Sequence, residues 1–212
     1  MSVRKVITRS SNHIRISFPS VKNGKPVQCE SQLESGFVRL LELSPLVRSY
    51  AVQPSLEVVS VCGTSKKYYP DVRVFLMDGR EWWFEVKQQK SLLVASVKLK
   101  LEAAKQHFTA TGRNFSIVTD RLILRQPLAD NLQKLMHHRR GPMLTNSRMQ
   151  EVREQLDMHS PETLDELIAI FGEPDAWLLL GFGIVGIDLE VPVLNDSEVF
   201  LSGGHRHADI FA

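Results

Sequence analysis

The stretch Tyr69–Lys87, YPDVRVFLMDGREWWFEVK, decides the fold that this sequence predicts. Both of its halves are rich in β-branched and aromatic residues, which is typical of strands. Between them stands an Asp-Gly dipeptide at 78–79, which favours the tight turn of a β-hairpin. The predicted hairpin carries Asp71 near the start of its first strand, and Glu85 and Lys87 near the end of its second.

These charged residues lie in surroundings that are otherwise apolar. Glu85 and Lys87 share one face of the second strand because strand side chains alternate with a period of two. Burial of two carboxylates is costly unless a cation compensates them, and hard oxygen ligands suit Mg²⁺ or Mn²⁺. The pattern of Asp71, Glu85 and Lys87 therefore predicts a metal-dependent phosphodiester hydrolase, in which Lys87 orients a water or stabilises a phosphoryl oxygen. The alternative is an edge hairpin in which Glu85 and Lys87 form an exposed salt bridge.

A further acidic ligand is expected from the preceding helix. Residues 31–43 have apolar side chains at helical spacing, which predicts an amphipathic helix. Glu34 lies at the margin of its buried face and is the first candidate, and Glu30 is the second. Either carboxylate could instead complement the helix dipole at the helix start.

The composition limits the class of protein. The chain has 212 residues, 43% of them hydrophobic, and two cysteines, Cys29 and Cys62. Two cysteines in unrelated contexts argue against a disulfide framework and suit a reducing cytosol. No signal peptide is visible, and the longest apolar run, 176–187, is shorter than the roughly 20 residues of a membrane span. We therefore expect a cytoplasmic protein with no membrane partner.

The charge is distributed unevenly along the chain. Residues 1–150 contain 24 Lys and Arg against 11 Asp and Glu, whereas residues 151–212 contain 2 against 13. A basic segment suits a polyanion such as DNA. The asymmetry and the polar stretch 137–147 predict two domains, 1–140 and 141–212.

The remaining elements of the first domain are predicted from local patterns. Residues 55–61 and 115–120 have strand composition, and the segment between the first of these strands and the hairpin, 62–69, is expected to be a loop. Residues 92–111 predict one long helix, with Gly112 ending it. Residues 127–137 predict a further helix.

The second domain has the element order of a winged helix. Helices are expected at 148–158, at 163–172 with Ser160 as its cap and Pro161 at its first position, and at 176–187. Two strands about an Asn-Asp turn follow at 189–202, and the tail 203–212 is expected to be mobile. Its His205, His207 and Asp209 are interpreted as an accidental likeness to a metal site. Because this domain is acidic and apolar, we expect it to dock a protein; the alternative is a structural cap on the first domain.

Basic and polar residues outside the hairpin are candidates for DNA contacts because they lie in the positively charged part of the chain. The candidates are Arg4, Lys5, Arg9, Arg15, Gln88, Lys98, Arg139 and Arg140.

Four short motifs occur together in the first domain. They are Glu30-Ser31-Gln32-Leu33-Glu34, Gln53-Pro54, Tyr68-Tyr69-Pro70-Asp71 and Glu85-Val86-Lys87. In this combination the chain resembles the TnsA endonucleases of heteromeric cut-and-paste transposons over roughly residues 13–135. The resemblance implies a restriction-endonuclease-like α/β core of the PD-(D/E)xK type, joined here to a small C-terminal winged-helix-like domain.

The resemblance also implies an activity and a site. It implies Mg²⁺-dependent cleavage of the non-transferred (5′) strand at transposon ends, with Mn²⁺ as the other suitable ion. The implied catalytic residues are Glu34, Asp71, Glu85 and Lys87, and the implied metal-binding residues are Glu34, Asp71, Glu85 and Val86. Some family members have Gln where Glu85 stands, and the carboxylate of Glu85 is the better metal ligand of the two.

The implied partners are transposon-end DNA, a DDE-type transposase and an AAA+ ATPase regulator that docks on the acidic domain. In some systems a nuclease-deficient CRISPR complex chooses the target. Two other functions fit the sequence: a free-standing restriction or repair nuclease, and an architectural transposition subunit whose site has lapsed. The complete set of acidic residues and lysine argues against the latter.

Overall fold

The computed structural model describes residues 15–139 and 143–211, which form two compact units. The first comprises the residues up to 42 together with 46–125, and the second comprises 43–45 together with the residues from 126 onward. The units therefore divide between Arg125 and Gln126, earlier than the boundary at 140/141 that the sequence predicted. The assignment of one unit to catalysis and the other to docking stays a prediction.

A four-stranded mixed sheet is the centre of the first unit. Its order is β3 (Val47–Val52), β6 (Val72–Leu76), β7 (Glu81–Lys87) and β8 (Asn114–Thr119). The pairs β3–β6 and β6–β7 are antiparallel, and β7–β8 is parallel. The β6–β7 pair is the predicted hairpin, and Gly79 at its turn has a φ of 90°. This mixed sheet and the seven α-helices of the described residues confirm the predicted α/β class and are compatible with a restriction-endonuclease-like core.

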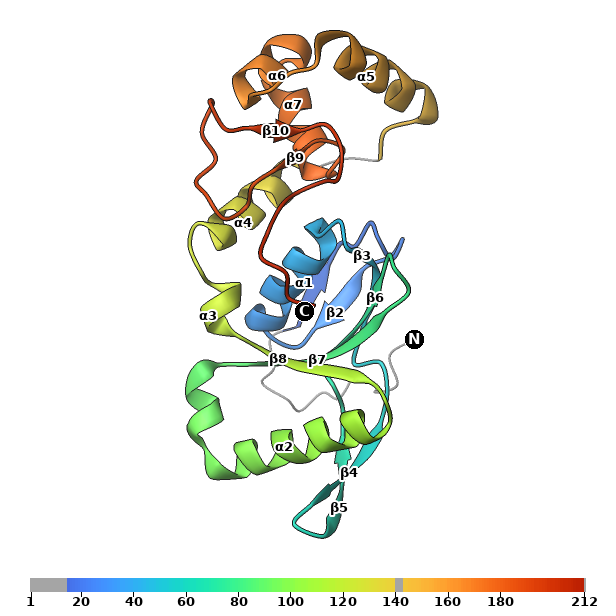
Figure 1. Cartoon of the computed structure of the whole chain (residues 1–212), viewed down its shortest axis with the longest axis vertical. Coiled ribbons are helices and arrows are strands. Elements are labelled where there is room, and N and C mark those ends of the chain that lie inside the picture. The colour runs from blue at the N-terminus through green and yellow to red at the C-terminus, as the bar shows by residue number, and fades with distance from the viewer. Residues whose placement is uncertain (1–14, 140–142, 212) are drawn as a thin grey trace. The chain divides into compact units, whose positions relative to one another are not determined.

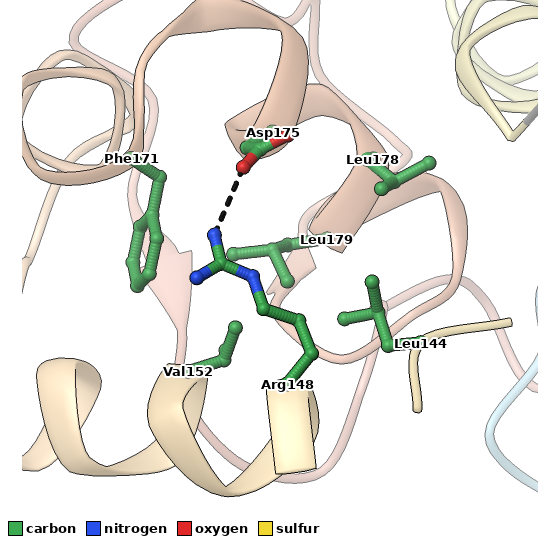
Figure 2. A pocket seen from close by; sticks show the side chains of 7 residues that line it. All are labelled: Leu144, Arg148, Val152, Phe171, Asp175, Leu178 and Leu179. Carbon is green, nitrogen blue, oxygen red and sulfur yellow. Dashed lines mark hydrogen bonds and ion pairs between the residues drawn. The ribbon is translucent and has the colours of Figure 1, made fainter. Parts of the chain in front are cut away.

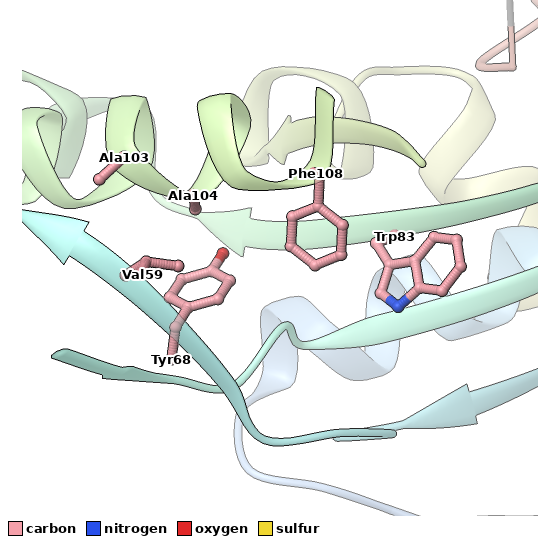
Figure 3. Packing of buried hydrophobic residues seen from close by; sticks show 6 residues of the cluster. All are labelled: Val59, Tyr68, Trp83, Ala103, Ala104 and Phe108. Atoms are coloured by element: carbon pink, nitrogen blue, oxygen red, sulfur yellow. The ribbon is translucent and has the colours of Figure 1, made fainter. Parts of the chain in front are cut away.

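Helices α1 (Gln32–Leu43) and α2 (Ala95–Ala110) cover opposite faces of this sheet (Figure 1). Consecutive residues of β7 establish this, because Phe84 meets Phe37 of α1 at 5.1 Å between ring centroids, whereas Trp83 meets Phe108 of α2 at 5.6 Å. Figure 3 shows Trp83 and Phe108 beside the buried Tyr68 under α2. The expected single helix over 92–111 is instead the 3₁₀ helix η1 (Gln89–Leu93) followed by α2.

Two smaller hairpins complete the strands of the first unit. One pairs β1 (Ile16–Phe18) with β2 (Val27–Cys29), and the other pairs β4 (Glu57–Val61) with β5 (Thr64–Tyr68). The expectation of a loop over 62–69 was wrong. Cys62 and Gly63 both have positive φ, 49° and 76°, and form a two-residue turn, which matches the twist of the flanking strands. The short helix α3 (Asp120–Ile123), which the sequence did not indicate, follows β8.

The second unit contains four helices and one short hairpin among its described residues. They are α4 (Leu128–His138), α5 (Asn146–His159), α6 (Leu164–Phe171), α7 (Glu173–Gly181), β9 (Gly186–Ile187) and β10 (Val199–Phe200). On α7, Trp177 stacks on His138 at 4.9 Å between centroids and lies 4.0 Å from the Lys134 ammonium, both of which belong to α4. Figure 2 shows Arg148 of α5 reaching Asp175 of α7, at 3.0 Å.

Several local expectations for this unit were wrong. Thr163, not Ser160, caps α6 by accepting from the Glu166 N–H, and Ser160 instead ends α5 in a left-handed conformation with φ 44°. The paired strands β9 and β10 are two residues each. Their order after three helices is the one expected, but the winged-helix assignment stays a prediction.

The tail is packed at His205, where mobility was expected. His205 is buried, with Nδ1 accepting from the Ile187 N–H at 3.2 Å and Nε2 lying 2.9 Å from the Leu180 carbonyl. Both ring nitrogens are therefore engaged by the main chain, which agrees with the interpretation that the His-x-His pattern is not a metal site. No helix in the described ranges is long and apolar enough to cross a membrane.

Candidate active site

Asp71 is held by the main chain of its neighbours at the start of β6. Its N–H donates to the Phe84 carbonyl at 3.0 Å, and its own carbonyl accepts from the Gln53 N–H at 2.8 Å. Its carboxylate accepts the Val86 N–H at Oδ2, at 2.7 Å. These bonds fix both the backbone and the side chain of Asp71 against the end of β7.

Glu85 and Lys87 lie with Asp71 at this end of the sheet. The Lys87 ammonium is 2.7 Å from Glu85 Oε1, 3.4 Å from Asp71 Oδ2 and 3.2 Å from the Val86 carbonyl oxygen. The Glu85 side chain is 4% exposed and that of Asp71 14%. Glu85 and Lys87 therefore do form the salt bridge of the alternative interpretation. It also includes Asp71, however, and both of its carboxylates are largely buried, whereas an exposed edge hairpin would leave them in solvent.

Tyr68 is a member of this cluster that the sequence analysis missed. Its hydroxyl donates to Glu85 Oε2 at 2.5 Å, and the residue is fully buried. The available signal was its place in the Tyr-Tyr-Pro-Asp motif, three residues before Asp71. Burial, and then the charge of Glu85, raise the pKa of Tyr68 well above its usual range, so the phenol keeps its proton and remains a donor.

The electrostatics of the cluster favour a charged Lys87 beside an Asp71 carboxyl that is difficult to ionise. Burial, followed by the charge of Glu85, raises the pKa of Asp71, and Lys87 partly opposes this. Burial alone would lower the pKa of Lys87, but Asp71 and Glu85 outweigh it and raise that pKa above its usual value. The two carboxylates therefore share one ammonium, an arrangement that favours additional positive charge.

Glu34 makes its hydrogen bonds at the start of its own helix. Its carboxylate accepts the Glu30 N–H at 2.9 Å and the Ser31 hydroxyl at 3.1 Å, while Ser31 accepts the Glu34 N–H, which is a capping box at the start of α1. Burial raises the pKa of Glu34 despite these bonds, and the charge of Glu34 contributes to the raised pKa of Asp71. Glu34 is thus within electrostatic range of the cluster, and its role as a ligand stays a prediction.

The donor set fits a hard divalent cation in part. Among the described residues, no group of three or more His, Cys, Asp and Glu converges as a metal cluster. Two carboxylates, from Asp71 and Glu85, and the Val86 carbonyl nevertheless converge on one cationic group, the Lys87 ammonium. Hard oxygens of this kind are the ligands that Mg²⁺ and Mn²⁺ prefer.

The predicted DNA-contacting residues are scattered. Arg4, Lys5, Arg9 and Arg140 lie outside the described residues. Gln88 and Arg15 are exposed, Arg139 is half-buried in the second unit, and Lys98 is exposed on α2 with its ammonium 3.9 Å from Glu102. Lys98 and Lys105 line a groove of about 260 Å³ whose floor includes Ile117, the β8 partner of Glu85. In the first unit, Gln88 directly follows Lys87 in sequence, and Lys98 shares a groove with Ile117.

A mixed α/β core that brings an Asp and a Glu-x-Lys to one end of its sheet is compatible with a restriction-endonuclease-like core. Residues 44–120 match the family model described as "TnsA-like endonuclease N terminal". The match covers 77 of the 212 residues, and it supports a TnsA-like endonuclease assignment for this part of the chain. The matched range contains Asp71, Glu85, Val86 and Lys87. A comparison with curated proteins finds no match.

Proposed function

We propose that this chain is a metal-dependent endodeoxyribonuclease subunit of a heteromeric transposase. In this proposal it hydrolyses the non-transferred (5′) strand at transposon ends, so that transposition proceeds by cut-and-paste. The observation that carries the proposal is the convergence of the Asp71 and Glu85 carboxylates on the Lys87 ammonium, within the part of the chain that matches the endonuclease family model.

The residues of the cluster would divide the work of phosphodiester hydrolysis. Lys87 stays protonated beside two carboxylates, so its ammonium supplies positive charge to phosphate oxygens as negative charge develops on them. The Val86 N–H donates a hydrogen bond to one carboxylate oxygen of Asp71, and the Tyr68 hydroxyl donates one to a carboxylate oxygen of Glu85. These two bonds fix the orientation of both carboxylates and direct their remaining lone pairs into the site.

Asp71, Glu85 and the carbonyl of Val86 would hold Mg²⁺ or Mn²⁺, with Glu34 as an additional predicted ligand. A divalent cation at such a site supplies Lewis-acid stabilisation of the phosphate and makes water a better nucleophile. The raised pKa of Asp71 supports this assignment, because a bound cation would offset both causes of the rise, burial first and then the charge of Glu85.

The DNA and protein partners follow from the two units. Gln88 and Lys98 would contact transposon-end DNA beside the cluster, and Arg4, Lys5, Arg9, Arg15, Arg139 and Arg140 remain further candidates for DNA contacts. In the second unit an open groove of about 640 Å³ is lined in part by Glu162, Asp196 and Glu198. An acidic groove suits a basic surface, and we assign it to the AAA+ ATPase regulator, with a DDE-type transposase as the other partner.

The test is a nicking assay on transposon-end DNA with Mg²⁺, run with and without the cognate transposase. The proposal expects one nick on the 5′ strand, strong dependence on the transposase, and loss of product with EDTA. Robust cleavage by the chain alone would favour a free-standing nuclease instead. No cleavage with all partners and with either Mg²⁺ or Mn²⁺ would contradict the catalytic assignment.

A further inference from the structure

Gln53, directly after β3, combines two unusual features beside the candidate active site. Its φ is 46°, in the left-handed region that residues other than glycine rarely adopt. The residue is 4% exposed, and its side-chain Oε1 is buried with no hydrogen-bond partner among the residues that the structure describes. Buried polar atoms almost always have a partner, so an exception calls for an explanation.

The strand registers place Gln53 next to Asp71. Val52 pairs with Val72, and Val72 pairs with Phe84. The next residues along these strands are Gln53, Asp71 and Glu85, and at this point the Asp71 N–H donates to the Phe84 carbonyl at 3.0 Å. The Gln53 N–H donates to the Asp71 carbonyl at 2.8 Å, so a main-chain hydrogen bond joins Gln53 to Asp71.

Both features lower stability unless something offsets them. A left-handed backbone and an unpaired buried acceptor are each unfavourable, and features of this kind concentrate at active sites, where the surroundings hold them in place. If the backbone conformation alone mattered at this position, glycine would serve better, because it adopts positive φ without steric conflict. The long buried amide therefore points to a role for the side chain.

We propose that Gln53 is a positioning residue of the candidate active site, in an inference that rests on the proposed function. Its N–H fixes the main chain of Asp71. Its side-chain amide accepts a hydrogen bond from a water molecule that is held in the site when a divalent cation is bound. Gln53 then acts through Asp71 and that water, without contacting the scissile phosphate itself.

The experiment uses the full chain and three substitutions. Gln53→Met keeps the side-chain length and the backbone conformation but removes the amide, Gln53→Asn keeps an amide, and Gln53→Gly removes the side chain and the backbone strain. Cys62→Gly is the matched control, since Cys62 also has a left-handed backbone, φ 49°, but lies exposed at the β4–β5 turn. Two readouts are needed: the midpoint of an Mn²⁺ titration followed by thermal shift without DNA, and kcat and KM for nicking with the cognate transposase.

We expect Gln53→Met and Gln53→Gly to raise the Mn²⁺ midpoint and lower kcat by about tenfold, the effect typical of residues that orient metal ligands. KM for DNA should not change, Gln53→Asn should recover part of the loss, and Cys62→Gly should behave as the unsubstituted chain. Where Gln53→Gly fails to fold, the comparison of Gln53→Met with Gln53→Asn decides.

An unchanged Mn²⁺ midpoint in Gln53→Met would overturn the inference about Gln53, as would a Cys62→Gly variant with the same losses. Failure of the proposed function gives a different result. In that case the unsubstituted chain does not nick DNA at all, while the Mn²⁺ titration still reports whether Gln53 orients the site.

Discussion

Tyr68 donates its hydroxyl to the buried carboxylate of Glu85 across 2.5 Å, and so links the β4–β5 hairpin to the central sheet. Glu85 has Lys87 as its other partner on the opposite oxygen. The hydrogen bond from the neutral donor orients the buried carboxylate, and the neighbouring cation neutralises its charge. The small hairpin thus supports the site from outside the strand that carries the Glu-x-Lys pattern.

Removal of this hydroxyl should weaken both stability and cation binding. Tyr68→Phe keeps the ring in its contacts with Phe108 and Phe115 and deletes only the hydrogen bond. We expect the free energy of unfolding at neutral pH to fall by about 1.5–3 kcal/mol, the range for a hydrogen bond to a charged group. Urea denaturation measures this. An unchanged unfolding free energy would show that Glu85 does not depend on Tyr68.

Asp71 is the residue whose loss should stop cleavage. Asp71→Asn leaves an acceptor for the Val86 N–H but removes the charge, and we expect nicking to fall by about 100-fold or more. In a transposition assay the products should shift from simple insertions to cointegrates. Asp78→Asn is the matched control, because Asp78 is exposed at the turn of the same hairpin and pairs with Arg80. Transposition that proceeds unaffected in Asp71→Asn would make the catalytic assignment wrong.

Lys87 should set the pH at which the site becomes active. Its charge lowers the pKa of Asp71, which burial and Glu85 raise. Lys87→Met removes the lowering influence, so the pKa of Asp71 should rise further, and the acidic limb of the residual nicking rate should move to higher pH. A series of rate measurements from acidic to alkaline pH tests this. Lys66→Met, on the exposed face of β5, should change neither rate nor profile.

Glu57 should make the first unit sensitive to acid. Its carboxylate accepts two hydrogen bonds from Arg113, each 2.9 Å long. These bonds lower the pKa of Glu57 from 4.5 to about 2. Burial opposes the change, and a hydrogen bond from His107 adds to it. A carboxyl whose pKa is lower in the folded state adds stability above its unfolded pKa and loses it as pH falls toward the folded value.

Arg113→Met should therefore cost about 2 kcal/mol of unfolding free energy at pH 7, a figure discounted for partial solvent screening. The difference from the unsubstituted chain should narrow as pH falls below about 4.5. Denaturant titrations at several pH values measure it. A difference that stays constant with pH would assign the effect to lost packing of Arg113 on Phe108, which lies 4.4 Å from the guanidinium.

The acidic groove of the second unit should matter for assembly and not for cleavage. Glu162→Lys combined with Glu198→Lys reverses two charges that line it, and we expect weaker capture of the AAA+ partner with unchanged nicking by the transposase complex. Glu166 is a poor choice for this series, because its carboxylate accepts the Glu162 N–H at 2.8 Å at the start of α6. Unchanged capture by the double variant would argue for a structural cap.

The sequence was sufficient for features that depend on local patterns. Asp78-Gly79 between two apolar strands predicted the β6–β7 hairpin, and alternation along β7 placed Glu85 with Lys87. The sequence was insufficient where the structure of a segment depends on pairing or packing with another segment. Thr64–Lys67 is polar and exposed, so no burial pattern marked β5, and the strand exists because it pairs with β4.

The candidate site divides in the same way. Asp71, Glu85 and Lys87 follow from one hairpin and were predictable, whereas the bond from Tyr68 requires a second hairpin to pack beside it. Glu34 was expected among the ligands from its place on the helix, and that role stays a prediction. Its carboxylate also serves N–H groups left unpaired at the helix start, and these bonds with Glu30 and Ser31 become visible only in the geometry of the cap.

The two cysteines differ in burial, and this difference allows one of them to be labelled selectively. Cys29 is fully buried and burial raises the pKa of its thiol to about 12, whereas Cys62 is exposed at the tip of the β4–β5 turn. A maleimide dye at neutral pH should therefore attach at Cys62 alone. The label would sit on the hairpin that carries Tyr68, where its fluorescence could report the arrival of DNA or of another subunit in real time.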